Sequence, residues 1–218
     1  MPIFKFREKL ILYSHIPKCA GQSIENYCQR LGAKIAFMDN DFCLHNYAGR
    51  AWNLTSPQHI SGDALSRLFP KEFFDDSFAV VRDPIDRLRS AFKFQKYKEK
   101  KIKEDITLSD FIKSDLDTCS RPLGLYDNHF LPQVELLVKK NSYKIFKLEN
   151  GLLDVKKYLD NNLFFNDSDI KLKHINLGIY NIEFSHEDTY VDDSSLEIIS
   201  RIYKRDFEVF GYEIIRST

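Results

Sequence analysis

A short segment near the start of the chain combines a cation, a glycine and a hydroxyl group as an anion-binding loop requires. Lys18, Gly21 and Ser23 lie between an apolar, β-favouring run at 10–13 and a segment with helical periodicity. A loop between a buried strand and a helix start directs backbone N–H groups and the positive end of the helix dipole at one point. The segment therefore predicts a site for an anion, most often a phosphate.

The spacing in this loop differs from that of a Walker A motif, in which the lysine follows the last glycine. Here Lys18 follows Pro17 and precedes Gly21. The next segment is predicted to be a helix because apolar residues recur at i, i+3, i+4 and i+7, and Gly32 stands where a helix would end. The apolar residues of this helix are Ile24, Tyr27, Cys28 and Leu31.

A second strand-to-helix junction follows about 60 residues later. Residues 77–81 are the best strand candidate, and they lead into Arg82 and then Pro84, which suits the first turn of a helix. The apolar stripe of that helix is Ile85, Leu88 and Phe92. Ser90 falls off this stripe and so can bind an anion, which makes a second anion site with Arg82.

Together the two junctions resemble the phosphate-binding motifs of the Golgi-type carbohydrate sulfotransferases, the family that includes heparan sulfate 2-O-sulfotransferase. The matching segments are HIPKCAGQS at 15–23 and SFAVVRDPIDRLRSAF at 77–92, and the family's usual form has Thr at position 19 and often at position 22. Weaker similarity at 127–133, 143–150, 174–176 and 203–212 extends the resemblance over most of the chain. It implies that 3′-phosphoadenosine 5′-phosphosulfate (PAPS) is the co-substrate. Its 5′-phosphosulfate would contact Lys18, Cys19, Ala20, Gly21, Gln22 and Ser23, and its 3′-phosphate Arg82 and Ser90.

Two side chains are candidates for catalysis. Sulfuryl transfer should resemble phosphoryl transfer, in which negative charge grows on the bridging oxygen of the leaving phosphate, and the point charge of Lys18 suits that oxygen. A histidine that is neutral near pH 7 can take the proton of an acceptor hydroxyl, and the resemblance implies His59 for this role. His129 is the reserve candidate for the base, and His15 is predicted to be a hydrogen-bonded packing residue.

Composition restricts the class of protein. With 32 basic and 32 acidic residues the formal charge is zero, which argues against a general nucleic-acid binder. The four cysteines show neither C-x-x-C pairs nor zinc-ligand spacing, so reduced thiols are expected, and no cluster of metal ligands is visible. The first 15 residues are too charged for a signal peptide, and no run of 18 apolar residues occurs. We therefore expect a cytoplasmic protein with no membrane anchor and no metal.

Several charged segments have two interpretations. Lys93 to Lys103 holds six lysines, which indicates either a solvated helix face or a surface that steers an anionic acceptor. Arg82 could pair with Asp83 or Asp86 instead of a phosphate. Arg87 could form a structural ion pair or contact the anion.

The remaining segments are predicted to be scaffold. A short strand is expected at 34–38, a helix from Ser61 to Leu68 with serine as its cap, and a strand at 143–148. Helices are expected at 151–162 and 196–207, with an exposed loop at 188–195.

These patterns predict a single α/β domain over residues 1–218, with a central parallel β-sheet flanked by helices and a P-loop-NTPase-like topology. The predicted activity is transfer of a sulfuryl group from PAPS to a hydroxyl acceptor, a glycan or a small alcohol. The alternatives are a non-catalytic module that binds a nucleotide or a glycan, and a nucleotide kinase, which would need Mg²⁺ and a Walker lysine.

Overall fold

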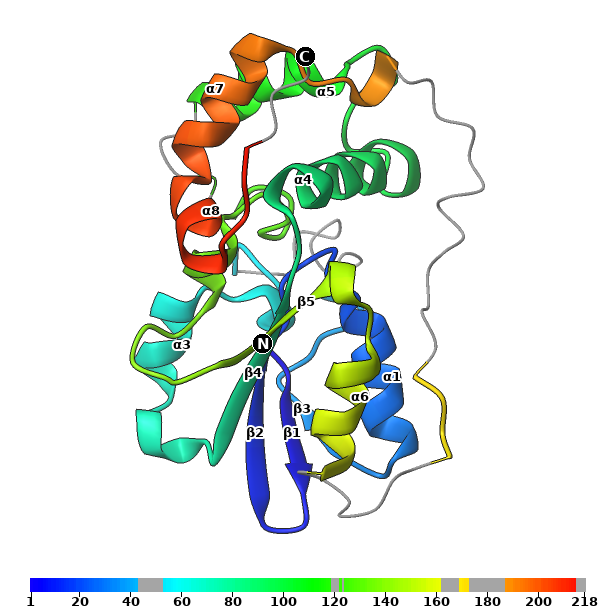
Figure 1. The fold of residues 1–218 in the computed structure, drawn as a ribbon, viewed down its shortest axis with the longest axis vertical. Coiled ribbons are helices and arrows are strands. Elements are labelled where there is room, and N and C mark those ends of the chain that lie inside the picture. The colour runs from blue at the N-terminus through cyan, green and yellow to red at the C-terminus, as the bar shows by residue number, and fades with distance from the viewer. Residues whose placement is uncertain (43–52, 119–121, 123, 162–168, 173–186, 215–218) are drawn as a thin grey trace.

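The computed structural model describes residues 1–42, 53–118, 122, 124–161, 169–172 and 187–214. Within these ranges the chain forms an α/β domain around a five-stranded sheet of order β3-β1-β2-β4-β5 (Figure 1). The strands are β1 (Ile3–Phe6), β2 (Lys9–Ser14), β3 (Lys34–Ala36), β4 (Asp76–Val81) and β5 (Lys144–Lys147). The α/β class is confirmed.

The sheet is mixed, so the prediction of a parallel sheet is wrong for one edge. β2, β4 and β5 run parallel to one another, whereas β1 is antiparallel to both β2 and β3. β1 and β2 form a hairpin whose turn contains Arg7 with φ of 52°, a left-handed conformation that usually favours glycine or asparagine. Because the turn carries no such residue, this hairpin could not be predicted from local patterns.

The helices include α1 (Gly21–Arg30), α3 (Gly62–Leu68), α4 (Pro84–Lys93), α5 (Leu108–Phe111), α6 (Leu153–Leu159), α7 (Asp193–Ile202) and α8 (Lys204–Phe210). α1 ends where Gly32 adopts φ of 87°, with Gly32 N–H donating to the Gln29 carbonyl and Ala33 N–H to the Cys28 carbonyl. This is the hydrogen-bond pattern of a glycine-terminated helix. The Ser61 hydroxyl accepts from Ala64 N–H at 3.3 Å and caps α3 as predicted.

The predicted helix at 196–207 is two helices, which meet at Tyr203. This residue has φ of −100° and ψ of 16°, outside the helical region, and its buried hydroxyl donates to the Phe130 carbonyl at 2.7 Å. The predicted loop at 188–195 is also wrong at its end, because Asp192 accepts from Ser195 N–H and starts α7 at Asp193. A tertiary bond that the local pattern does not encode determines the first boundary, whereas a local aspartate cap determines the second.

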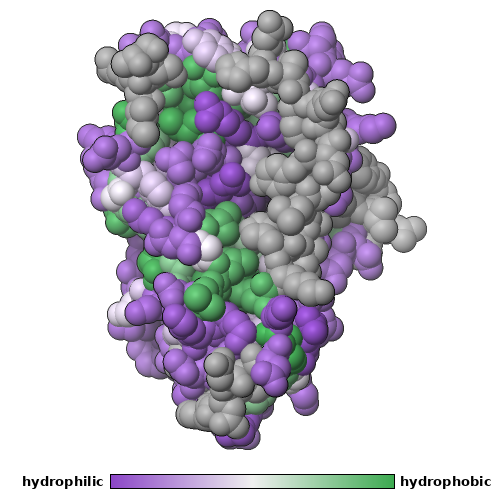
Figure 2. Space-filling model, turned by 45° about the vertical axis from the view of Figure 1, so that its right-hand side comes forward, coloured by the Kyte–Doolittle hydropathy of each residue, from purple (hydrophilic) through white to green (hydrophobic). Residues whose placement is uncertain are grey.

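Two apolar clusters hold the domain together. One packs around the sheet with α1 and α6 on one side and α3 on the other, and the second joins α4, α5, α7 and α8 (Figure 1). On the surface shown in Figure 2, apolar side chains gather in patches between hydrophilic regions. No helix in the described part of the chain is long and apolar enough to span a membrane.

Candidate active site

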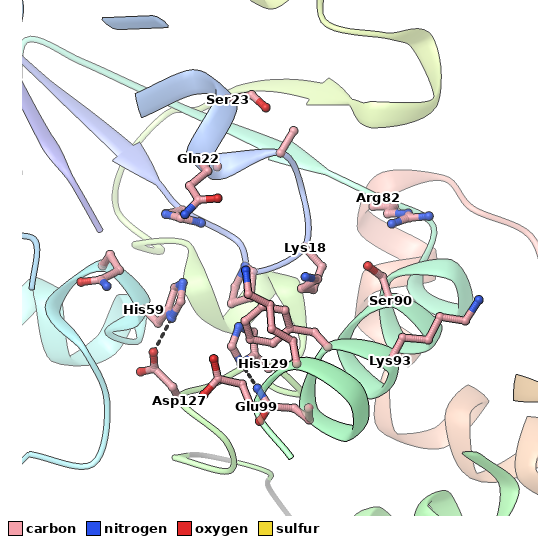
Figure 3. A pocket seen from close by; sticks show the side chains of 18 of the residues that line it. Lys18, Gln22, Ser23, His59, Arg82, Ser90, Lys93, Glu99, Asp127 and His129 are labelled. Atoms are coloured by element: carbon pink, nitrogen blue, oxygen red, sulfur yellow. Dashed lines mark hydrogen bonds and ion pairs between the residues drawn. The ribbon is translucent and has the colours of Figure 1, made fainter. Parts of the chain in front are cut away.

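A cavity of about 710 Å³ opens where β2 and β4 end, and it is lined by the two predicted anion-binding loops (Figure 3). Because β2 and β4 are parallel neighbours, the loops that follow them meet at the same edge of the sheet. The volume lies within the range of small-molecule and cofactor sites, roughly 300–1,000 Å³. One cavity therefore collects residues that are far apart in the sequence.

The first loop turns sharply from β2 into α1. Lys18 and Ala20 have φ of 70° and 63°, and Ala20 precedes α1 without a side-chain cap. Lys18 lines the cavity, and so do the four residues Ala20, Gly21, Gln22 and Ser23. Cys19 does not, because its side chain is fully buried and its Sγ atom lies 3.8 Å from Gln133 Oε1. Burial raises the pKa of this thiol to about 12.

Gly21 is required by close packing against His15. A Cβ atom at position 21 would lie 2.0 Å from Nε2 of the His15 ring. That ring is already confined, since it stacks on Tyr13 with 5.7 Å between centroids and its Nδ1 lies 2.5 Å from Glu25 Oε1. His15 thus has the packing role that the sequence predicts, with the Glu25 carboxylate beside its ring.

We expect Gly21→Ala to lower the free energy of unfolding by about 1–3 kcal/mol, the usual cost of overpacking, because the methyl group must displace the His15 ring. Chemical denaturation of the parent and the variant measures this. The double variant with His15→Ala is the control, and it should recover part of the loss relative to His15→Ala alone. Unchanged stability in the single variant would contradict the packing described here.

Lys18 lies near two other cations, Lys98 and Arg82, and near one carboxylate, Glu99, which opposes them more weakly. Its Nζ lies 4.0 Å from the centroid of the Phe94 ring, and no carboxylate among the described residues forms an ion pair with it. Burial, together with the charges of Lys98 and Arg82, lowers the pKa of Lys18 to about 8. A bound anion would relieve this repulsion, so the surroundings of Lys18 favour an anionic ligand.

The second loop places Arg82 and Ser90 beside the same cavity, on the side of Lys18 away from His59 (Figure 3). The alternative partners of Arg82 are engaged elsewhere: Asp83 Oδ1 accepts from two N–H groups of the first turn of α4 at 3.0 Å, and Asp86 pairs with Arg89. Arg87 is a structural residue, because it is buried and donates to the carbonyls of His129 and Leu131. Arg82 is thus left with its guanidinium available to the cavity.

His59 is held in one orientation by a carboxylate that the sequence analysis did not single out. It ends a 3₁₀ turn, Pro57–His59, and its Nδ1 lies 2.7 Å from Asp127 Oδ2. Asp127 also accepts from Ser56 N–H at 2.6 Å and from the Ser56 hydroxyl at 2.9 Å. When the neutral ring carries its proton on Nδ1 and donates a hydrogen bond to Asp127, Nε2 is unprotonated and can accept a proton.

The protonation states follow from burial and charge. Burial lowers the pKa of His59, and the attraction of Asp127 only partly opposes this. Burial also works against ionisation of Asp127, but His59 and the bonds from Ser56 outweigh it and the pKa of Asp127 falls to about 2. At neutral pH the pair is therefore a neutral imidazole beside a carboxylate, which is the state that a general base requires.

Asp127 lies in a strained turn. Tyr126, Asp127 and Asn128 have φ of 47°, 57° and 60°, and a left-handed residue with a side chain costs roughly 1–2 kcal/mol. Asn128 uses its side chain here, donating from Nδ2 to the His59 carbonyl and accepting from Gly124 N–H, both at 2.7 Å. Two consecutive residues of the strained turn therefore fix the ring and the backbone of His59.

Residues 2–213 of this chain match the model of the sulfotransferase family. The chain belongs to the sulfotransferase family. Comparison with curated proteins and with solved structures gives no match. The family relation supports sulfuryl transfer as the general activity of the chain.

His129, the second histidine candidate in this sulfotransferase, has a hydrogen-bond donor beside Nδ1 where His59 has a carboxylate. Gln95 Nε2 donates to Nδ1 of His129 at 2.7 Å, so the proton of the neutral ring is on Nε2. Burial and the neighbouring His59 lower the pKa of His129 well below its usual value. His129 can donate a hydrogen bond at neutral pH, but it is poorly suited to accept a proton.

The lysine-rich segment 93–103 is divided between two environments. Lys96 is 3% exposed and pairs with Asp188 at 2.8 Å, so the interpretation as one solvated face is wrong for this residue. Lys93, Lys98 and Lys101 line the cavity, and Lys98 lies 5.5 Å from the Phe94 ring that also contacts Lys18. Lys93 was not predicted to be a site residue, although its position three residues after Ser90 on α4 places it on the same side of the helix.

Some expectations are left as predictions. Within the described ranges, no group of three or more His, Cys, Asp or Glu side chains could hold a metal ion. The similarity at 174–176 falls outside the residues that the structure describes, as do Cys43 and Cys119. The domain limits and the cytoplasmic location stay predictions.

Proposed function

We propose that this sulfotransferase transfers a sulfuryl group from PAPS to a hydroxyl group, with Lys18 at the leaving phosphate and His59 as general base. The observation that carries the proposal is the order of groups in one cavity: Arg82 and Ser90 at one end, Lys18 in the middle and His59 beyond it (Figure 3). A donor with anions at both ends of an adenosine needs two cationic sites on one side of the proton acceptor. The two loops supply these sites.

The residues of the cavity fit such a donor. Lys18 and Arg82 are cations without a carboxylate partner among the described residues. Lys93 adds a third positive charge to the cavity, and its pKa is lowered by burial and by the charges of Arg89 and Arg82. PAPS would supply the activated sulfuryl group. Lys18 would hold its charge at the bridging oxygen, where stabilisation of developing charge lowers the barrier.

His59 would accept the proton of the attacking hydroxyl at Nε2, while Asp127 stabilises the cation that forms on the ring. The distance of 2.7 Å between His59 Nδ1 and Asp127 Oδ2 supports this assignment. The alternative base, His129, is disfavoured because Gln95 donates to its Nδ1. We assign Asp127 as a positioning residue, because it acts through His59.

We propose a carbohydrate hydroxyl as the acceptor and a P-loop-like topology for the fold. The acceptor rests on the resemblance of both loops to the carbohydrate sulfotransferases. The topology is supported by the strand, loop and helix at β2 and α1 and by the parallel strands β4 and β5 beside them. A screen with ³⁵S-labelled PAPS over glycans and small alcohols tests the acceptor, and a protein that binds the nucleotide but transfers label to nothing would be a binding module.

The first test is the affinity for adenosine 3′,5′-bisphosphate as a function of pH. An anion beside Lys18 raises its pKa, so the complex holds more protons than the free protein above pH 8. We therefore expect the affinity to be nearly constant between about pH 7 and pH 7.5 and to fall, by up to about tenfold per pH unit, as the pH rises through the Lys18 pKa of about 8.

Titration calorimetry at pH 7, 8 and 9 measures this, and buffers of different ionisation enthalpy report the proton uptake. The control is Lys18→Met, in which the decline above pH 8 should disappear. Equal affinities at all three pH values in the parent would remove Lys18 from the phosphate site, and no measurable binding would remove the donor assignment.

A further inference from the structure

Gln133 contacts the backbone of Arg82 with both ends of its side-chain amide. Arg82 N–H donates to Oε1 at 3.0 Å, and Nε2 donates to the Arg82 carbonyl at 2.8 Å. Gln133 is fully buried and begins a 3₁₀ turn, Gln133–Leu136. Since an amide that pairs with both backbone groups replaces the bonds of a neighbouring strand, it fixes the residue just beyond the end of β4.

The same amide also reaches the first loop. The thiol of Cys19 lies 3.8 Å from Gln133 Oε1, and the Cys19 side chain is fully buried. One oxygen therefore contacts the loop that carries Lys18 and the residue that is proposed to bind the 3′-phosphate. The contacts are made away from the cavity, which Gln133 does not line.

Gln133 is itself held rigidly by the scaffold. Its N–H donates to Asp206 Oδ2 at 2.8 Å, and Val134 N–H donates to the other oxygen of the same carboxylate at 2.9 Å. Asp206 is fully buried in α8. Arg87 anchors the preceding residues through the carbonyls of His129 and Leu131. Because Gln133 is fixed to the scaffold and contacts both loops, it holds both loops in a defined position relative to the scaffold.

We infer that Gln133 is a positioning residue that sets the separation of the two anion-binding loops, so that one nucleotide with a phosphate at each end engages both. The inference rests on the proposed function, which gives each loop a phosphate. Two linked groups bind more tightly than either alone only when the spacing of their sites matches the linker. A small displacement of either loop should therefore weaken a bisphosphate far more than a monophosphate.

The test compares three ligands: adenosine 3′,5′-bisphosphate, adenosine 5′-monophosphate and adenosine 3′-monophosphate. Gln133→Met removes both bonds to Arg82 with little change in volume, and Gln133→Glu keeps an acceptor for Arg82 N–H but loses the donor to the carbonyl. For Gln133→Met we expect bisphosphate affinity to fall by about tenfold to a hundredfold, while each monophosphate loses less than about threefold. Gln133→Glu should show the same selective loss, and it serves if Gln133→Met does not fold.

Asn141→Ala is the matched control. The Asn141 side chain donates to the Ser77 hydroxyl at 3.1 Å, a partly buried polar contact at the start of β4 that touches neither loop. This variant should lose stability without changing the ratio of bisphosphate to monophosphate affinity. An unchanged ratio in the Gln133 variants, or an equal loss for all three ligands, would overturn the inference. A parent protein that does not prefer the bisphosphate would instead overturn the proposed function.

Discussion

Replacement of His59 by alanine should lower kcat by about 10²–10⁴-fold, the usual contribution of a general base. The affinity for adenosine 3′,5′-bisphosphate should change less than about threefold, because His59 lies beyond Lys18 from the phosphate-binding residues (Figure 3). Transfer of ³⁵S from labelled PAPS to the acceptor found in the screen gives kcat, and calorimetry gives the affinity. A His59→Ala variant with the turnover of the parent would eliminate His59 as the base.

Asp127→Asn tests the other half of the pair. Loss of the carboxylate removes the charge that supports protonation of His59, so the pKa of His59 should fall further. The rate depends on the unprotonated ring, and the acid limb of the kcat profile should therefore move to lower pH while the plateau also falls. Asp105→Asn, a change at an exposed carboxylate, is the control and should leave the profile in place. A purely structural role for Asp127 would lower the plateau without moving the limb.

Replacement of Lys18 by methionine should lower kcat by about 10²–10³-fold, the cost of removing a group that stabilises charge in the transition state. The stability of the folded protein should not fall, because Lys18 is half-buried near the charges of Lys98 and Arg82 and its lowered pKa shows that the folded state disfavours the charge. Loss of activity with an unchanged or raised unfolding midpoint separates a functional lysine from a structural one.

Lys98→Met is the matched control for that change. Lys98 lies over the same Phe94 ring as Lys18, 5.5 Å from the centroid, but its side chain is exposed. We expect its removal to lower kcat by less than about threefold, because solvent screens an exposed charge. If the two variants lose similar activity, the cavity attracts anions only through its total charge and Lys18 has no special place in it.

Local patterns were sufficient for the parts of the site that lie next to regular structure. The strand, loop and helix around Lys18 and the junction at Arg82 were predicted correctly, because each depends on spacing within about 20 residues. The helix caps at Ser61 and Gly32 follow from the same local chemistry. The sulfotransferase family was also indicated by these two segments.

Contacts between distant segments were beyond the reach of such patterns. Asp127 reaches His59 from a turn whose three left-handed residues include no glycine, and nothing in the sequence pairs it with the 3₁₀ turn at Pro57. Gln133 was noted only as part of a segment with family resemblance, although its amide joins both loops. β1 itself was not predicted, since the two-residue turn between β1 and β2 contains no glycine or asparagine to indicate a hairpin.

The burial of Cys19 determines how the loop responds to chemical attack. Alkylating agents and peroxide react with thiolates, and a thiol with a pKa of about 12 is almost entirely protonated at pH 7. The sulfur is also enclosed, with 0% of the residue accessible. Although a cysteine stands within the loop around Lys18, that position is protected from oxidants and thiol-directed inhibitors.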